Sequence, residues 1–183
     1  SSALIPYIIN FEDPFVLLST VNWVITMNPF NDKKLTFDEL QNDCLCFLQY
    51  KGKPVKASRL FAGNEHEIQS LKLAKHFNVA EDSYKHVLYD KDIITKLRVK
   101  FKQNKKLDSK ILKNCPFNKR DLSKFENYDE AYHQLIFDLV KQQIYSLRLI
   151  LNSGVKRIFV DGGFGKNAMV AIFTYHDTIK EKK

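Results

Sequence analysis

The sequence has few glycines, prolines and cysteines, and each scarcity excludes a class of protein. Six glycines and five prolines in 183 residues are too few for a collagen-like or low-complexity chain. The three cysteines, Cys44, Cys46 and Cys115, give no even disulfide framework, and the sequence offers no second cysteine pair to complete a zinc site. We therefore expect no metal site, and reduced core cysteines of a cytoplasmic protein.

Long apolar runs are also missing. The apolar stretch at residues 3–9 is too short to span a bilayer, and no basic segment precedes it as in a signal peptide. We therefore expect no membrane partner, and we interpret the abrupt apolar start as a fragment boundary. With 44% hydrophobic residues, the chain is predicted to be one globular domain over residues 1–183.

Acidic residues are outnumbered, and the excess of positive charge is local. The net charge is +8, and residues 98–124 contain ten Lys and Arg against only Asp108 and Asp121, which accounts for the whole excess. We interpret this stretch as a solvated, mobile excursion from the fold. It has only Phe101 and Phe117 as stacking groups, so binding of nucleic acid stays the weaker alternative.

The β-rich segments predict two hairpins. Residues 15–20 and 23–28 are two runs of strand-forming side chains with a two-residue break between them. Residues 44–50 and 55–61 form a second pair, joined by a Lys-Gly-Lys-Pro turn.

Three helices are predicted from N-cap patterns. Thr36 precedes Glu39 in a capping box, and Asn64 precedes Glu67 in the same way ahead of an apolar stripe of Ile68, Leu71, Ala74 and Phe77. Asn127 opens the longest helix, which we expect to end at Gly154 and whose stripe is Ala131, Leu135, Leu139, Ile144 or Tyr145, and Leu149.

A short buried strand at residues 157–160 then leads into a glycine-rich turn and a further helix at 168–173. Antiparallel hairpins, a long helix and a last strand together predict an α/β fold with a mixed sheet and flanking helices.

The glycine-rich turn is the first candidate binding site. Gly162 and Gly163 permit positive φ and close approach of a ligand, and the N-terminus of the following helix suits phosphate. Asn167 offers both a donor and an acceptor to an adenine or ribose edge. The spacing matches neither the Walker nor the dinucleotide motif, so a purely structural turn remains the alternative.

The turn of the first hairpin is the second candidate site. Thr20, Val21 and Asn22 combine a hydroxyl group with backbone N–H groups that a tight turn presents to phosphate. An ordinary hairpin turn is the alternative.

Four segments resemble the C-terminal domain of FGGY carbohydrate kinases, which belong to the actin-like, ribonuclease-H-like ATPase superfamily. They are LSTVNWVITMNPF at 18–30, GKPVKASRLFAG at 52–63, YDEAYHQL at 128–135 and IFVDGGFGKN at 158–167, and they occur in the family order. Within the family the chain looks most similar to kinases of ketoses and deoxyketoses such as rhamnulose, fuculose and xylulose.

The resemblance implies a ribonuclease-H-like domain that binds ATP with Mg²⁺ and transfers phosphate to a sugar hydroxyl. Gly162, Gly163 and Asn167 would line the adenosine and α-phosphate site, and the turn at Thr20, Val21 and Asn22 would face the β- and γ-phosphates. In the family, the catalytic Asp lies just before the stretch that matches the residues starting at Ser1. The family's sugar-binding domain is also absent from this chain. The resemblance thus implies no catalytic residue here, and a chain inactive alone.

The turn departs from the family pattern. Relatives have Gly-Thr where this chain has Val21-Asn22, and valine at positive φ is costly and crowds a phosphate. A non-catalytic relative that acts as an interaction module is therefore the first alternative function.

Overall fold

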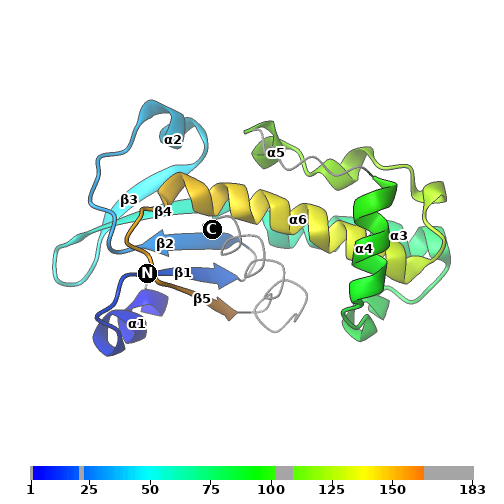
Figure 1. The fold of residues 1–183 in the computed structure, drawn as a ribbon, viewed down its shortest axis with the longest axis horizontal. Helices are drawn as coiled ribbons and strands as arrows, with labels where there is room; N and C mark the ends of the chain where they lie inside the picture. The colour runs from blue at the N-terminus through cyan, green and yellow to red at the C-terminus, as the bar shows by residue number, and fades with distance from the viewer. Residues whose placement is uncertain (1, 21–22, 102–108, 163–183) are drawn as a thin grey trace.

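The computed structural model describes residues 2–20, 23–101 and 109–162, and these build a sheet with helices on both faces (Figure 1). The strands are β1 (Phe15–Thr20), β2 (Val24–Asn28), β3 (Cys44–Leu48), β4 (Pro54–Leu60) and β5 (Arg157–Gly162). Their order in the sheet is β3-β4-β2-β1-β5. β5 runs parallel to β1, whereas the other neighbours are antiparallel, so the predicted mixed sheet is confirmed.

Both predicted hairpins are confirmed. β1 pairs with β2 so that Thr20 lies opposite Val24, and β3 pairs with β4. The strand predicted at 157–160 also forms and continues to Gly162, but none of its residues is fully buried, so the predicted burial is wrong. The predicted helix at 168–173 lies outside the described residues.

The longest helix, α6 (Tyr128–Ile150), covers one face of the sheet, and α1 (Ile5–Asn10) packs against the other (Figure 1). Alternation along β1 explains the two layers. Val16 and Leu18 pack with Leu147 of α6, whereas Phe15 and Leu17 join the apolar cluster that includes residues of α1.

The remaining helices are shorter. They are α2 (Phe37–Gln41), α3 (Ala62–Phe77), α4 (Lys91–Lys100) and α5 (Lys110–Lys113), with 3₁₀ turns at Ser2–Leu4, Ser83–His86, Pro116–Lys119 and Leu122–Lys124. Figure 1 shows α3 and α4 gathered around the first half of α6, where both contact it.

Two of the three predicted N-caps are confirmed. The Thr36 hydroxyl accepts a hydrogen bond from the Glu39 N–H at 3.2 Å, and the Glu39 carboxylate accepts one from the Thr36 N–H at 2.7 Å. The Asn127 side chain accepts a bond from the Glu130 N–H at 2.8 Å.

The third predicted helix start is wrong. α3 begins at Ala62, so Asn64 lies within its first turn, and no side chain caps its N-terminus. The predicted stripe is also wrong in part, because Ile68 and Leu71 are exposed. The helix instead buries Ala62, Gln69, Ser70, Leu73 and Ala74. Gln69 tolerates burial because its amide donates to Glu65 and Asn118.

α6 ends four residues before the predicted Gly154, because side chains from elsewhere bind its last carbonyl group. Asn28 and Asn31 both donate to the Ile150 carbonyl oxygen, at 2.8 and 2.9 Å. Both asparagines are almost fully buried. A helix end with such partners needs no glycine to terminate it.

Where the structure describes it, the basic stretch packs against α6 instead of leaving the fold, although most of its Lys and Arg residues are exposed, as predicted. Cys115, Phe117 and Phe125 are buried in the cluster that α6 forms. Arg120 makes a two-pronged ion pair with Asp138 of α6, at 2.5 and 3.0 Å, and Lys100 pairs with Glu130 at 2.8 Å. The count of charges did not indicate these buried apolar side chains. The two ion pairs weaken the case for a surface that binds nucleic acid.

The cysteines are free thiols, but only two of them are in the core. Cys44 and Cys115 are buried, whereas Cys46 is exposed. Cys46 lies on β3, an edge strand of the described sheet, so the prediction of three core cysteines is wrong for this residue.

We predict that Asp138→Ala lowers the free energy of unfolding by about 3–5 kcal/mol, because it leaves the Arg120 guanidinium without its buried partner. Urea denaturation of the full chain measures this. Glu126→Ala is the control, since the Lys96–Glu126 pair is exposed and its loss should leave stability nearly unchanged. Equal losses in the two variants would contradict the assignment.

We also predict that His66 makes the fold sensitive to mild acid. Burial lowers its pKa from 6.5 to about 4, and its Nε2 lies 3.0 Å from the Tyr132 hydroxyl. The unfolded chain therefore binds a proton at His66 more readily than the folded chain does. The contribution of neutral His66 to the free energy of unfolding is complete above about pH 6.5 and is lost as the pH falls towards 4. The total is up to roughly 3 kcal/mol.

The measurement is urea denaturation between pH 7 and pH 4, compared with His66→Gln. The substituted chain should lose less stability over this interval, because the other titrating groups are common to both proteins. Parallel pH curves for the two proteins would refute the prediction.

Candidate functional site

The parallel strands β1 and β5 end side by side. We refer to the end of the sheet where their carboxyl ends lie as its edge. Thr20, the last residue of β1, is the register partner of Gly162, the last residue of β5. β2 starts next to them at Val24, and α3 starts at Ala62 just after β4. Ligands of open α/β sheets commonly bind outside the carboxyl ends of parallel strands, so this edge is the candidate site.

Glycine is required at position 162 because of its backbone conformation and its contact with Thr20. Its φ is +97°, a conformation that residues with a side chain rarely adopt. A Cβ atom would lie 2.2 Å from the carbonyl oxygen of Thr20 and 2.8 Å from its carbonyl carbon. The glycine therefore permits close contact between the ends of β1 and β5, in addition to any approach of a ligand.

Thr20 uses its hydroxyl group to bind β5. The side chain is buried, and its Oγ1 donates a hydrogen bond of 2.7 Å to the Asp161 carbonyl oxygen. Asp161 is exposed, and its Oδ1 accepts a bond of 2.8 Å from the Gly162 N–H. The described contacts of Thr20 thus hold the edge of the sheet together.

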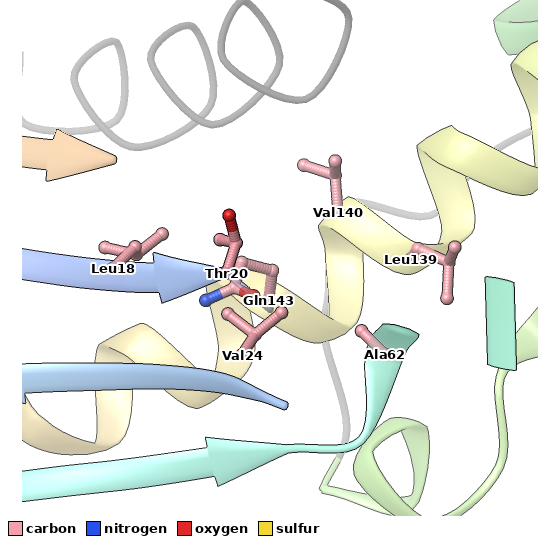
Figure 2. Close-up of a pocket in the computed structure, with 7 residues that line it drawn as sticks. All are labelled: Leu18, Thr20, Val24, Ala62, Leu139, Val140 and Gln143. Carbon is pink, nitrogen blue, oxygen red and sulfur yellow. The ribbon is translucent and has the colours of Figure 1, made fainter. Parts of the chain in front are cut away.

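A mostly apolar pocket opens beside this edge, between the strand ends and the middle of α6. Figure 2 shows its lining residues, Leu18, Thr20, Val24, Ala62, Leu139, Val140 and Gln143. Thr20 and Gln143 are the polar members, and the Gln143 amide donates to the Thr26 hydroxyl at 3.1 Å. The lining of the pocket is of the kind found in small-molecule sites, but its volume of about 20 Å³ is far below theirs.

Sequence reasoning missed most of this pocket. Its wall joins the ends of strands to α6, more than a hundred residues further along the chain. Gln143 follows Lys141 and Gln142 in α6, so no local pattern singled it out.

A second feature of the edge is an aromatic pair. The Trp23 ring stacks on Phe61 with centroids 4.4 Å apart, and the Arg59 guanidinium carbon lies 5.6 Å from the Trp23 ring. Arg59 is held by an ion pair with Asp43. Trp23 is 42% exposed and lies near the end of β1, so its fluorescence can report changes at this edge.

Of the six predicted binding residues, the structure brings Thr20 and Gly162 together. Val21, Asn22, Gly163 and Asn167 lie outside the described residues, so their roles stay predictions. Within residues 2–20, 23–101 and 109–162, no cluster of His, Cys, Asp and Glu could hold a metal ion. Over the same residues, the helices are too short or too polar to cross a membrane.

No protein-family model matches this chain, and no curated protein matches it. A solved structure, a carbohydrate kinase from Novosphingobium aromaticivorans, is similar with a TM-score of 0.60 and 16% sequence identity. The match covers 91% of this chain and 35% of the kinase chain. At this identity the likeness shows the fold alone, and it confirms the predicted α/β, ribonuclease-H-like class.

We predict that Gly162→Ala destabilises the fold by about 1–3 kcal/mol, because alanine is strained at this φ and its Cβ would collide with the Thr20 backbone. Urea denaturation measures the loss. Gly154→Ala is the matched control, since no atom lies within 4 Å of the added Cβ there. A Gly162→Ala chain as stable as the control would show that the contact is absent.

Proposed function

We propose that this chain is the nucleotide-binding half of an ATP-dependent sugar kinase of the FGGY family. The observation that carries the proposal is the meeting of Thr20 and Gly162 at one sheet edge, in a fold shared with part of a carbohydrate kinase. The chain spans about a third of that kinase. The complete reaction is therefore proposed for a longer protein, and we expect the chain alone to be inactive.

The adjacency of the two strand ends supports a single bound nucleotide. Val21 and Asn22 directly follow Thr20, and Gly163 directly follows Gly162. The segments proposed for the β- and γ-phosphates and for adenosine with the α-phosphate therefore leave the sheet at neighbouring points. The apolar pocket beside them, about 20 Å³ in volume, is too small to enclose a base, so a base would have to lie outside it.

Mg²⁺ is proposed to arrive with the phosphates of ATP. Protein sites for this ion commonly supply only one or two carboxylates and leave the other positions to phosphate and water. The described residues fit such a site, because Asp161 places one exposed carboxylate at the edge and no metal-binding cluster accompanies it there. The ion would neutralise charge on the transferred phosphate.

The remaining catalytic parts are proposed to lie elsewhere in the longer protein. Phosphoryl transfer depends on positioning and on charge stabilisation, and this half would hold the nucleotide for both. The family resemblance puts the general base, an Asp, upstream of Ser1, and it puts the sugar in a second domain. A ketose or deoxyketose is the proposed substrate.

One observation favours a second function. Val21 and Asn22 replace the Gly-Thr of the family at the phosphate turn. A relative that had lost phosphate binding and served as an interaction module would tolerate this change.

The test is a titration of the folded chain with Mg-ATP, followed by Trp23 fluorescence and by calorimetry. We expect saturable binding that AMP partly competes, because the adenosine site would lie on this chain. Absence of binding from a folded chain would contradict the kinase proposal and favour the interaction module.

Variants at the two segments sharpen the test. Gly163→Val should weaken binding, whereas the double variant Val21→Gly, Asn22→Thr should strengthen it by restoring the family turn. Gly154→Val is the control at a remote, open position. Unchanged affinity in Gly163→Val would remove that residue from the site.

A further inference from the structure

We infer that Thr20 is a positioning residue, which fixes the carboxyl ends of β1 and β5 relative to each other. The inference rests on the proposed function, because the segments that follow these two strand ends are the proposed nucleotide contacts. It differs from the family-based expectation, in which Thr20 itself belongs to the phosphate-binding turn. Here the Thr20 side chain acts on nucleotide binding through β5.

The first step of the argument is the direction of the hydroxyl bond. Thr20 is only 1% exposed, and its O–H donates to the Asp161 carbonyl oxygen at 2.7 Å. This bond joins a side chain at the end of β1 to the backbone of β5, over 141 residues of sequence. It therefore adds a side-chain link to the backbone pairing at the last register position of the two strands.

The second step is the contact on the backbone of the same residue. Gly162 approaches the Thr20 carbonyl group so closely that no Cβ atom fits between them. Thr20 is thus held to β5 by its side chain and by its main chain together. Two constraints at one residue restrict both the distance and the twist between the strand ends.

The third step is the place of Thr20 relative to the pocket. Thr20 lines the pocket of Figure 2 together with Gln143 of α6. One residue therefore contacts the pocket, directly precedes the hairpin turn and binds the strand that precedes Gly163. Loss of the hydroxyl should change the geometry of two proposed ligand contacts at once.

The experiment compares Thr20→Val, which removes the O–H donor and keeps the shape, with Thr20→Ser, which keeps the donor. Ser58→Ala is the matched control, because Ser58 is equally buried, lies in the same sheet and loses a hydroxyl that bonds Ser146, away from the residues that line the pocket. Each full-length variant is titrated with Mg-ATP by calorimetry. Its amide hydrogen exchange without nucleotide is measured by mass spectrometry over residues 157–162.

We expect Thr20→Val to weaken Mg-ATP binding about tenfold, the factor that corresponds to about one hydrogen bond. Exchange at residues 157–162 should also accelerate. Thr20→Ser should restore both quantities, and Ser58→Ala should leave both near the parent values even if its thermal stability falls.

Two results would overturn the inference. If the parent binds Mg-ATP and Thr20→Val binds equally well, Thr20 does not position the site. If Ser58→Ala weakens binding as much, the effect is one of general stability. A folded parent that binds no nucleotide would instead refute the proposed function and, with it, this role of Thr20; the exchange data would then show only whether the link to β5 exists.

Discussion

The burial of α6 is the constraint on which the rest of the structure depends. Eighteen of its 23 residues are buried, so this helix is enclosed on nearly all sides rather than on one stripe. Buried polar groups on it need partners, and neighbouring elements supply them. Ser146 bonds Ser58 of β4, Gln143 bonds Thr26 of β2, and His133 accepts a bond from the Asp90 N–H ahead of α4. The helix thus fixes the sheet and the α3–α4 region to one another.

Features that depend on neighbouring residues were predictable from the sequence. The two hairpins, the capping box at Thr36 and the strand that enters Gly162 all appear where their local patterns placed them. Features that depend on distant partners were not predictable. The buried face of α3 includes Gln69, and the basic stretch is anchored by Arg120, because residues far along the chain satisfy these polar groups.

The candidate site shows the same division. The glycine pattern identified Gly162, but the register that sets it against Thr20 is a property of two strands more than a hundred residues apart. The wall that Leu139 and Val140 contribute to the pocket arises only when α6 lies across the strand ends (Figure 2). Local chemistry thus identified Thr20 and Gly162, and their surroundings come from the tertiary fold.

The parallel pairing of β1 with β5 has a consequence for synthesis of the chain on the ribosome. β1 is complete at Thr20, but its second neighbour is complete only at Gly162. Until then one side of β1 presents unpaired N–H and C=O groups, which are a template for pairing with other chains. Long-range pairing of this kind forms slowly, and nascent chains are prone to aggregate while it is incomplete. The pairing that completes the sheet in the folded domain therefore leaves one side of β1 open to wrong pairing until Gly162 has been made.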